Sequence, residues 1–485
     1  MPELPDPAAF GAIFQEFMEA MTAAAERPDS ELAKRMRDHL GTDPGRLPVT
    51  AAEFPTTEHP NVQLALDAVL PDAEVIGVTS RHPGFVASLG DLTSGSGIGA
   101  QLRTGPVHYV DIEVGDGRVV RCVAGGLFLV HQGGAPLALA LSRGDRAYGP
   151  QNNVLRIEII SPADDAVGSL LAELRAAMRE HNVFRGKVVS LHQNEMGVGT
   201  VRFHTVPHVP RESVILPPGT MERLERQAIG IAEQAERLRA AGRHLKRGVL
   251  LHGPPGTGKT LSVTYLLGAM PGRTTILLTG RGLGLIEEAL AMARELVPAT
   301  VVFEDIDLVA AERMMDMGDG GILFELLNQM EGVEEDADLL FLLTTNRPDI
   351  VEPALAARPG RIDLALDIPL PDEDGRRRLL ALYAGDAELD AATETEVVAR
   401  TEGTPGAFIR ELMRQAALRA ALEGAARASS REVMAVLEEL LDERSALTRR
   451  LLGQPGEGDG EPHPAMERAM RMAGIPFPPD FDEFE

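Results

Sequence analysis

The motif G-x-x-x-x-G-K-[ST] constrains this chain more than any other feature. An apolar run at 248–252 precedes its eight residues, which are Gly253, Pro254, Pro255, Gly256, Thr257, Gly258, Lys259 and Thr260. The glycines let backbone N–H groups turn toward an anion, and a helix starting near Lys259 adds its positive end. This order of strand, loop and helix predicts a P-loop that binds phosphates, with Leu261 closing the binding segment. Lys259 is expected to reach the β- and γ-phosphates, and Thr260 to ligate Mg²⁺.

The segments around this motif predict the architecture. From residue 248 to 371, apolar strands, loops and helices alternate, which is typical of a parallel sheet with helices on both faces. Residues 372–452 have an almost entirely helical pattern, and 206–218 form a proline-rich linker. We therefore expect an α/β nucleotide-binding domain at 206–371, followed by a small helical domain at 372–452.

The residues before the linker predict an α+β region. Residues 1–75 have a polar, helical pattern, with a stripe of Phe and Met side chains near the start. At 76–205 we expect a domain of short strands and one helix near 166–179, with hairpins at Asp116-Gly117 and Gly133-Gly134. The strands are expected at 107–114, 118–124, 127–130, 136–141, 154–160 and 188–191.

Composition excludes several classes of protein. With 47 basic and 73 acidic residues among 485, the net charge is −26, which argues against a protein that coats nucleic acid. The single cysteine, Cys122, excludes an intrachain disulfide and a cysteine-based zinc site, so we expect a cytoplasmic protein. No signal peptide or transmembrane run is expected. Residues 453–485 are acidic and rich in Gly and Pro, which predicts a mostly disordered tail.

Paired carboxylates follow a second apolar strand. Residues 301–303 lead directly into Glu304 and Asp305, the pattern called Walker B. One carboxylate of such a pair holds Mg²⁺ and the other activates the attacking water, so Thr260, Glu304 and Asp305 are the predicted metal ligands. A third strand at 339–343 leads to Asn346, which is suited to orient that water or to contact the γ-phosphate.

These motifs, together with Pro-Ala-Leu-x-x-Arg-Pro-Gly-Arg-x-Asp at 353–363, resemble the AAA branch of the AAA+ ATPases over roughly residues 206–445. The resemblance implies that ATP and Mg²⁺ are bound and that Asn346 is the sensor 1 residue. It also implies that Arg358 and Arg361 reach the γ-phosphate of an adjacent subunit, where a cation increases the rate about 10³–10⁵-fold. A homo-oligomeric ring, usually a hexamer, is therefore expected, acting on an unidentified protein partner. Residues 401–407 resemble the turn of the family's helical lid that carries the sensor 2 arginine in other clades. Here Ala407 occupies the position of that arginine.

The chain departs from the family pattern in two places. The family usually has Asp-Glu at Walker B, and the swapped order Glu304-Asp305 resembles that of the mitochondrial AAA translocases of the folded Rieske protein. Asp305 aligns with the catalytic position and is our expected base, although Glu304 remains an alternative. The threading loop has only Leu283-Gly284 where unfoldases have an aromatic–aliphatic–Gly step. Strong gripping of an unfolded chain is therefore not expected.

Two further interpretations remain open. One is an assembly module in which ATP binding builds the ring and hydrolysis is slow or regulatory. The other is a nucleic-acid motor, which the net charge and the 4% aromatic content disfavour.

The sequence also has four histidines close together, which we interpret as ordinary residues rather than as a metal site: His181, His192, His204 and His208.

Overall fold

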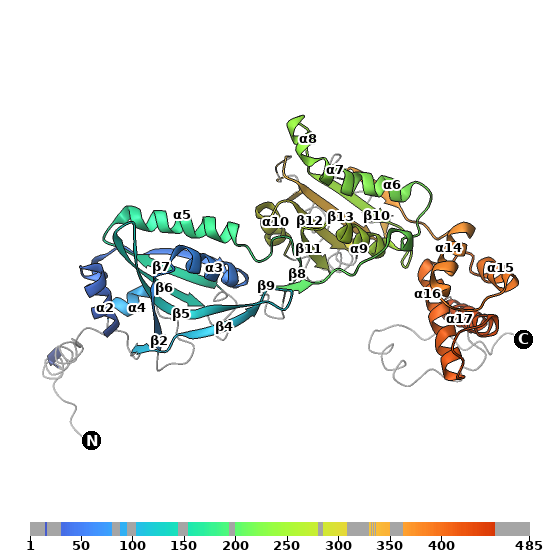
Figure 1. Cartoon of the computed structure of the whole chain (residues 1–485), viewed down its shortest axis with the longest axis horizontal. Coiled ribbons are helices and arrows are strands. Elements are labelled where there is room, and N and C mark those ends of the chain that lie inside the picture. The colour runs from blue at the N-terminus through green and yellow to red at the C-terminus, as the bar shows by residue number, and fades with distance from the viewer. Residues whose placement is uncertain are drawn as a thin grey trace, which may run out of the picture. The chain divides into compact units, whose positions relative to one another are not determined.

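A computed structural model describes most of the chain. The described residues are 15–16, 31–79, 88–94, 103–143, 154–193, 199–279, 285–307, 329–330, 332, 334, 336–349 and 362–451. They fall into two compact units (Figure 1). The first comprises 1–211, 219–253 and 259–367, and the second comprises 212–218, 254–258 and 368–485. None of the helices in the described ranges is both long and apolar enough to cross a bilayer.

The first unit begins with an antiparallel sheet of seven strands. Its order is β1-β7-β6-β5-β2-β3, and β4 pairs with β5. The strands are β1 (Thr50–Pro55), β2 (Glu74–Thr79), β3 (Arg103–Gly105), β4 (His108–Glu113), β5 (Val119–Gln132), β6 (Ala135–Arg143) and β7 (Val154–Ile160). The expected hairpins join β4 to β5 and β5 to β6. Asp116, Gly117, Gly133 and Gly134 in them have positive φ, as tight hairpin turns require.

Helices cover both faces of this sheet (Figure 1). On β6, Leu137, Leu139 and Leu141 pack with α3 (His59–Val69) and α5 (Asp164–Glu180). The alternate residues Ala138 and Ala140 pack with α2 (Glu31–Leu40) and α4 (Leu89–Ser94). The smaller elements beside them are η1 (Pro44–Arg46) and η2 (Thr56–Glu58). The N-terminal domain is therefore a three-layer α/β/α arrangement.

Two expectations for this region were wrong. Residues 1–75 are not helical throughout, because β1 pairs with β7 along its whole length. The expected strands 118–124 and 127–130 are one strand, β5, in which the pairing with β4 shifts register beside Gly125. The extra residue is Ala124, so a β-bulge beside the glycine pair interrupts the pairing with β4 while the strand continues. The early stripe of Phe and Met side chains lies outside the described residues.

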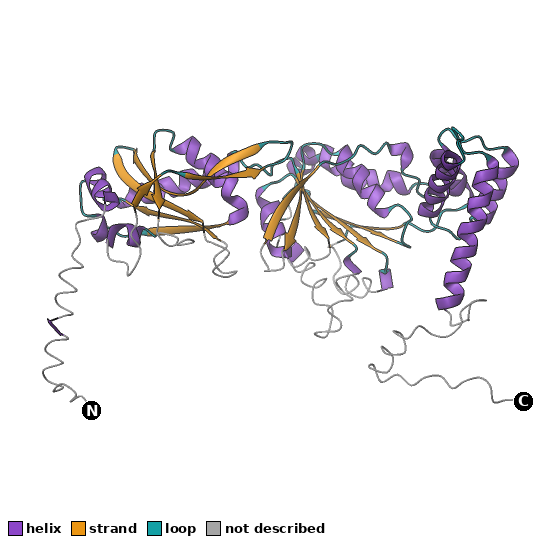
Figure 2. Ribbon diagram, turned by 90° about the horizontal axis from the view of Figure 1, so that it is seen from below, coloured by secondary structure: helices purple, strands orange, loops and turns teal. Residues whose placement is uncertain are grey.

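The second sheet of this unit is mainly parallel, and it confirms the predicted α/β class. Its order is β14-β10-β13-β12-β11-β8-β9, with only β9 antiparallel to its neighbour. The strands are β8 (Val188–Gln193), β9 (Gly199–His204), β10 (Arg247–His252), β11 (Thr274–Thr279), β12 (Ala299–Glu304), β13 (Leu339–Thr345) and β14 (Leu364–Asp367). Figure 2 shows this twisted sheet with helices packed against it.

The expected domain boundary at residue 205 cuts through this sheet. Residues 188–204, which we assigned to the N-terminal domain, form β8 and β9, and β8 pairs in parallel with β11. Val189 and Leu191 are buried in the same core as Ile276 and Leu278 of β11. The physical reason is that β11 would otherwise present an unpaired apolar edge, which the extra hairpin covers.

Helices pack against the parallel sheet. On one side, α10 (Ile286–Glu295) buries Ala289 and Leu290 against Val301 and Phe303 of β12. The remaining described helices of this domain are, in chain order, η5 (Arg211–Ser213), α6 (Thr220–Glu225), η6 (Arg226–Gly230), α7 (Ile231–Glu233), α8 (Ala235–Ala240) and α9 (Lys259–Ala269).

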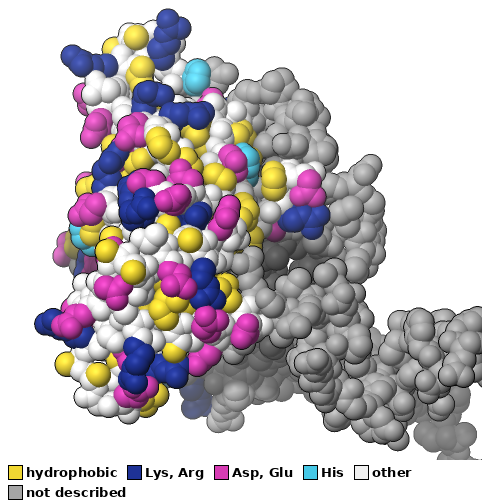
Figure 3. Space-filling model, turned by 90° about the vertical axis from the view of Figure 1, so that its right-hand side faces the viewer, with side chains coloured by type: hydrophobic (Ala, Val, Ile, Leu, Met, Phe, Trp, Pro, Cys, Tyr) yellow, Lys and Arg dark blue, Asp and Glu magenta, His cyan; other side chains and the backbone are white. Residues whose placement is uncertain are grey.

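The described part of the second unit after Ile368 is mainly helical. It contains α14 (Glu373–Ala384), α15 (Ala391–Arg400), α16 (Gly406–Leu422) and α17 (Ser430–Leu451). Asp372 and Asp390 cap α14 and α15 by accepting backbone N–H groups. On the face seen in Figure 3, acidic and basic side chains are interspersed rather than gathered by sign. The predicted tail at 453–485 lies outside the described residues.

Candidate nucleotide-binding site

The P-loop connects the end of β10 to the start of α9. Gly253, Gly256 and Gly258 have φ values of 139°, 77° and 108°, which side chains with a Cβ rarely adopt. The Thr257 hydroxyl donates to the Pro254 carbonyl at 2.9 Å and so closes the loop. The three glycines of the loop are therefore explained by backbone conformation, as the sequence pattern implied.

Lys259 lies inside this loop. Its side chain is 6% exposed, and Nζ donates to the Gly253 carbonyl at 2.8 Å. Burial lowers the pKa of Lys259, while the charges of Asp305 and Asp307 oppose that shift. An ammonium group held at the Gly253 carbonyl, near the charges of Asp305 and Asp307, is suited to bind phosphate oxygens.

The P-loop threonine and the Walker B carboxylates lie together. The Thr260 hydroxyl hydrogen-bonds to Glu304, the last residue of β12. Burial raises the pKa of Glu304, and the neighbouring charge of Asp305 raises it further. A hydroxyl and two carboxylates are hard oxygen ligands, which suit Mg²⁺. In the described part of the chain, no group of three or more His, Cys, Asp or Glu side chains is arranged to hold a metal unaided.

Asp305 is held differently from Glu304. Its φ is +50°, an uncommon value outside glycine, and its N–H donates to Thr344 Oγ1 at 3.0 Å. The Asn346 amide donates to Asp305 Oδ1 at 3.0 Å. The predicted sensor 1 side chain therefore orients Asp305, whereas the P-loop threonine contacts Glu304.

Asp307 connects the same two strand ends, a role that the sequence did not reveal. Its Oδ1 accepts from the Thr345 hydroxyl at 2.9 Å and from the Asn346 N–H at 3.0 Å. The side chain is buried, so these bonds are shielded from water. Asp307 thus fixes the backbone that carries the Asn346 amide. The pattern Glu-Asp-x-Asp carried this signal, but spacing alone does not identify the partner strand.

The predicted arginines cannot be placed, since Arg358 and Arg361 lie outside the described residues, as does Leu283-Gly284. Asp363, which ends the same motif, is described. Its Oδ2 accepts from the Gly248 N–H at 2.7 Å, and its own N–H donates to the Gly248 carbonyl. Asp363, the last residue of the Arg-Pro-Gly-Arg-x-Asp motif, is therefore hydrogen-bonded to β10, the strand that leads into the P-loop.

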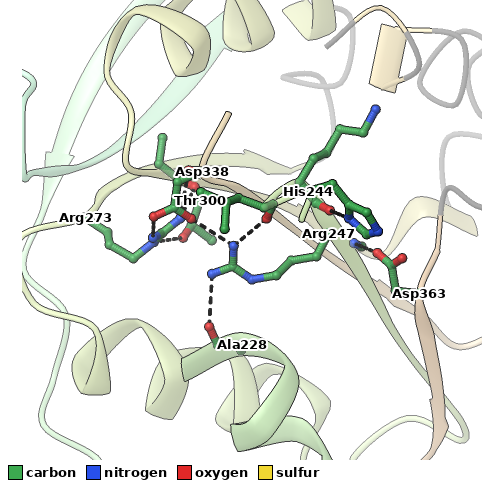
Figure 4. Close-up of polar contacts among 11 residues, drawn as sticks. Ala228, His244, Arg247, Arg273, Thr300, Asp338 and Asp363 are labelled. Carbon is green, nitrogen blue, oxygen red and sulfur yellow. Dashed lines mark hydrogen bonds and ion pairs between the residues drawn. The ribbon is translucent and has the colours of Figure 1, made fainter. Parts of the chain in front are cut away.

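A buried ionic cluster supports the opposite end of these strands (Figure 4). Asp338 accepts from Arg247 Nη1 at 2.8 Å and from Arg273 Nη1 at 2.7 Å. Arg247 also donates to the Ala228 carbonyl, and Arg273 to Thr300. Burial alone would raise the pKa of Asp338, but the two guanidinium groups hold it below its usual value. The sequence analysis missed this cluster because its members are separated by up to 91 residues.

Comparison with known proteins agrees with this geometry. Residues 249–370 match the AAA family, described as "ATPase family associated with various cellular activities". These residues are therefore similar to the AAA family of ATPases, and they contain the α/β fold that the motifs predicted.

Curated relatives match a little under half of the chain. A proteasome-activating nucleotidase of Methanopyrus kandleri is 34% identical over 230 residues, which cover 44% of this chain and 50% of that protein. ATP-dependent zinc metalloprotease FtsH 1 of Symbiobacterium thermophilum is 35% identical over 212 residues, or 41% and 36% of the two chains. The chain spans half or less of the length of these relatives.

Proposed function

We propose that this protein hydrolyses ATP in a ring of identical subunits and uses that reaction to remodel or move a protein partner. The observation that carries the proposal is the meeting of Lys259, Thr260, Glu304, Asp305 and Asn346 at the carboxyl ends of neighbouring parallel strands. In open α/β sheets, ligands bind at this edge. The match of the surrounding domain to an ATPase family supports the same reaction.

Each residue has a role in the proposed reaction. The P-loop backbone and Lys259 bind the β- and γ-phosphates, while Thr260 and Glu304 would hold Mg²⁺. When bound, that ion would neutralise charge on the β- and γ-phosphate oxygens. Asp305 accepts a proton from the water whose oxygen attacks the γ-phosphorus, and Asn346 keeps the carboxylate in position. The bond from the γ-phosphorus to the ADP oxygen breaks, giving ADP and phosphate.

The assignment of Asp305 as the base rests on its hydrogen bond from Asn346. Glu304 instead contacts Thr260, as a carboxylate beside the metal would. The test compares ATP turnover of Asp305→Asn and Glu304→Gln while ATP binding is monitored separately. We expect Asp305→Asn to bind ATP and to lose turnover. Normal turnover in Asp305→Asn, together with none in Glu304→Gln, would reverse the assignment.

We propose that Arg358 and Arg361 act in trans, which makes hydrolysis depend on assembly into a ring, expected to be a hexamer. Mixing two inactive variants tests this directly. Arg361→Ala keeps its own Walker B site, and Asp305→Asn keeps its arginines, so a mixed ring contains complete interfaces. We expect the mixture to regain turnover that neither variant has alone. A mixture that stays inactive, although the subunits co-assemble, would contradict action in trans.

We propose a protein partner, selected by the N-terminal domain, and a cytoplasmic location. The relatives' names refer to activating a proteasome and to ATP-dependent proteolysis. Proteolysis by this chain is not proposed, because the sequence contains no H-E-x-x-H motif. The Glu304-Asp305 order and the lack of an aromatic near Leu283-Gly284 favour mild remodelling, like that of the Rieske-protein translocases, over threading of an unfolded chain.

The same two features motivate the alternative, an assembly module with slow or regulatory hydrolysis. The hydrolysis-deficient variant Asp305→Asn, held in ATP, distinguishes the two. A remodelling enzyme should retain a partner protein on the closed ring and release it when ATP is removed. Recovery of the ring alone, at a normal wild-type ATPase rate without any processing of a partner, would favour the assembly module.

A further inference from the structure

The backbone of Asp305 has a left-handed conformation, with φ at +50°. Among the described residues, Asp116 is the only other non-glycine residue with positive φ, and it lies in the tight turn between β4 and β5 that requires it. Asp305 instead follows directly on β12, where a strand could simply continue. Such a conformation is unfavourable and persists only where the surrounding structure holds it.

The side chain of Thr344 holds this backbone. Thr344 belongs to β13 and is 1% exposed, and its hydroxyl oxygen accepts the Asp305 N–H at 3.0 Å. This bond fixes the peptide group between Glu304 and Asp305. The next residue of β13, Thr345, points to the opposite face of the sheet and donates to Asp307. Two adjacent threonines therefore hold the segment after β12 at two points.

The left-handed conformation changes the direction of the Asp305 carboxylate. In a continuing strand, successive side chains point to opposite faces, so Glu304 and Asp305 would diverge. Here Glu304 meets the Thr260 hydroxyl, and Asp305 Oδ1 lies 3.0 Å from the Asn346 amide. The nearby charge of Asp305 acts to raise the pKa of both Glu304 and Lys259. The two carboxylates therefore serve one site.

The same conformation accounts for an aspartate at this position. Asp and Asn are several-fold enriched among non-glycine residues with positive φ, because their short polar side chains tolerate it. A glutamate would place its carboxylate one methylene further from the same backbone, away from the position that the Asn346 amide meets. The backbone conformation and the shorter side chain thus fit each other.

We propose that Thr344 is a positioning residue for ATP hydrolysis. Its hydroxyl fixes the left-handed backbone of Asp305 and thereby aims the shorter carboxylate of the swapped Glu-Asp pair at the attacking water. Thr344 acts through Asp305 and is not expected to touch ATP. The inference rests on the proposed role of Asp305 as the base.

Steady-state ATPase kinetics, with ATP binding measured separately, test this role. Thr344→Val keeps the shape of the side chain and removes the acceptor, so we expect kcat to fall about 10–100-fold while KM and ATP affinity change little. Thr344→Ser keeps the hydroxyl and should retain most of the turnover. The matched control, Thr275→Val, changes a buried threonine near the start of β11, at the opposite edge of the sheet, and should leave kcat unchanged.

A second comparison tests the conformation of Asp305 itself. Asp305→Glu keeps a carboxylate but should lower kcat about tenfold, because the left-handed backbone disfavours the longer side chain and misplaces its carboxylate. In the Thr344→Val background that backbone is no longer held, so Asp305→Glu should cause a smaller further loss than it does in the wild type. Losses that simply multiply in the double variant would show that Thr344 and the Asp305 backbone act independently, which would overturn the proposal.

Wild-type kcat in Thr344→Val would overturn it as well. If Asp305→Asn nevertheless loses turnover, only the positioning role of Thr344 fails, and Asp305 remains the base. Normal turnover in Asp305→Asn would instead remove the proposed base and this inference with it.

Discussion

The two sheets of the first unit place their buried polar groups in different ways. In the parallel sheet, charged residues sit at strand ends, where Asp305 and Asp307 meet Asn346 and where Asp338 pairs with two arginines. In the antiparallel sheet, neutral side chains from α3 instead form hydrogen bonds with the backbone of β5. Gln63 accepts from the Val123 N–H and His59 hydrogen-bonds to the Val123 carbonyl.

This difference follows from topology. All carboxyl ends of a parallel sheet lie on one edge, so residues distant in sequence gather there and can form a charged site. In the N-terminal sheet, β4 is the one strand among the described residues that pairs with the first half of β5, and α3 supplies the hydrogen bonds of Val123 on its other side. The charged strand ends of the parallel sheet can form a catalytic site, whereas the α3 contacts hold the backbone of β5 in place.

The largest expected effect tests the charged cluster. Replacing Asp338 by Ala leaves Arg247 and Arg273 buried without their carboxylate, and we expect a loss of about 3–5 kcal/mol in the free energy of unfolding. Chemical denaturation monitored by circular dichroism measures it. The exposed neighbour Asp336→Ala is the control and should change little. Similar small losses in both variants would show that the cluster does not stabilise the sheet.

The neutral arrangement should make the N-terminal domain sensitive to acid. His59 is fully buried, and burial lowers its pKa from 6.5 to about 4. The unfolded chain therefore binds more protons between these values, so stability is full above pH 6.5 and falls as the pH drops toward 4. We expect about 3 kcal/mol of this loss to depend on His59. Unfolding of His59→Gln should show a correspondingly flatter pH profile, and an unchanged profile would refute the assignment.

Asp307 tests whether the strand-end contacts matter for turnover rather than for folding. Asp307→Asn weakens the bonds that hold Thr345 and the Asn346 backbone, so we expect kcat to fall roughly 10–100-fold, less than the loss of a general base would cause, while KM changes little. Steady-state ATPase kinetics measure both constants. Asp349→Asn, which affects a surface pair with Arg347, is the control. Equal kcat in both variants would assign Asp307 a merely structural role.

The smallest effect concerns one neutral hydrogen bond. Gln63→Leu leaves the buried Val123 N–H without its acceptor, and we expect a loss of about 1–2 kcal/mol in the free energy of unfolding. The exposed Gln234→Leu should cost less. A loss as large as that of Asp338→Ala would remove the contrast between charged and neutral buried groups.

The sequence predicted the parallel sheet well because its signals are local. The P-loop glycines, the carboxylates after β12 and Asn346 after β13 each follow an apolar run, and parallel topology then brings them together. The strand at 188–191 was predicted, but its pairing with β11 and the α3 contacts to Val123 were not, because they depend on which edge a distant segment covers. The Arg247–Asp338–Arg273 cluster is of the same kind, since no short pattern announces it.

ATP turnover by Asp305→Asn, measured beside the wild type under saturating ATP and Mg²⁺, tests the central claim most directly. The substitution keeps the shape of the side chain and removes its ability to accept a proton. The account predicts ATP binding close to that of the wild type and kcat reduced about 10²–10⁴-fold. Turnover at the wild-type rate, with ATP bound normally, would contradict it.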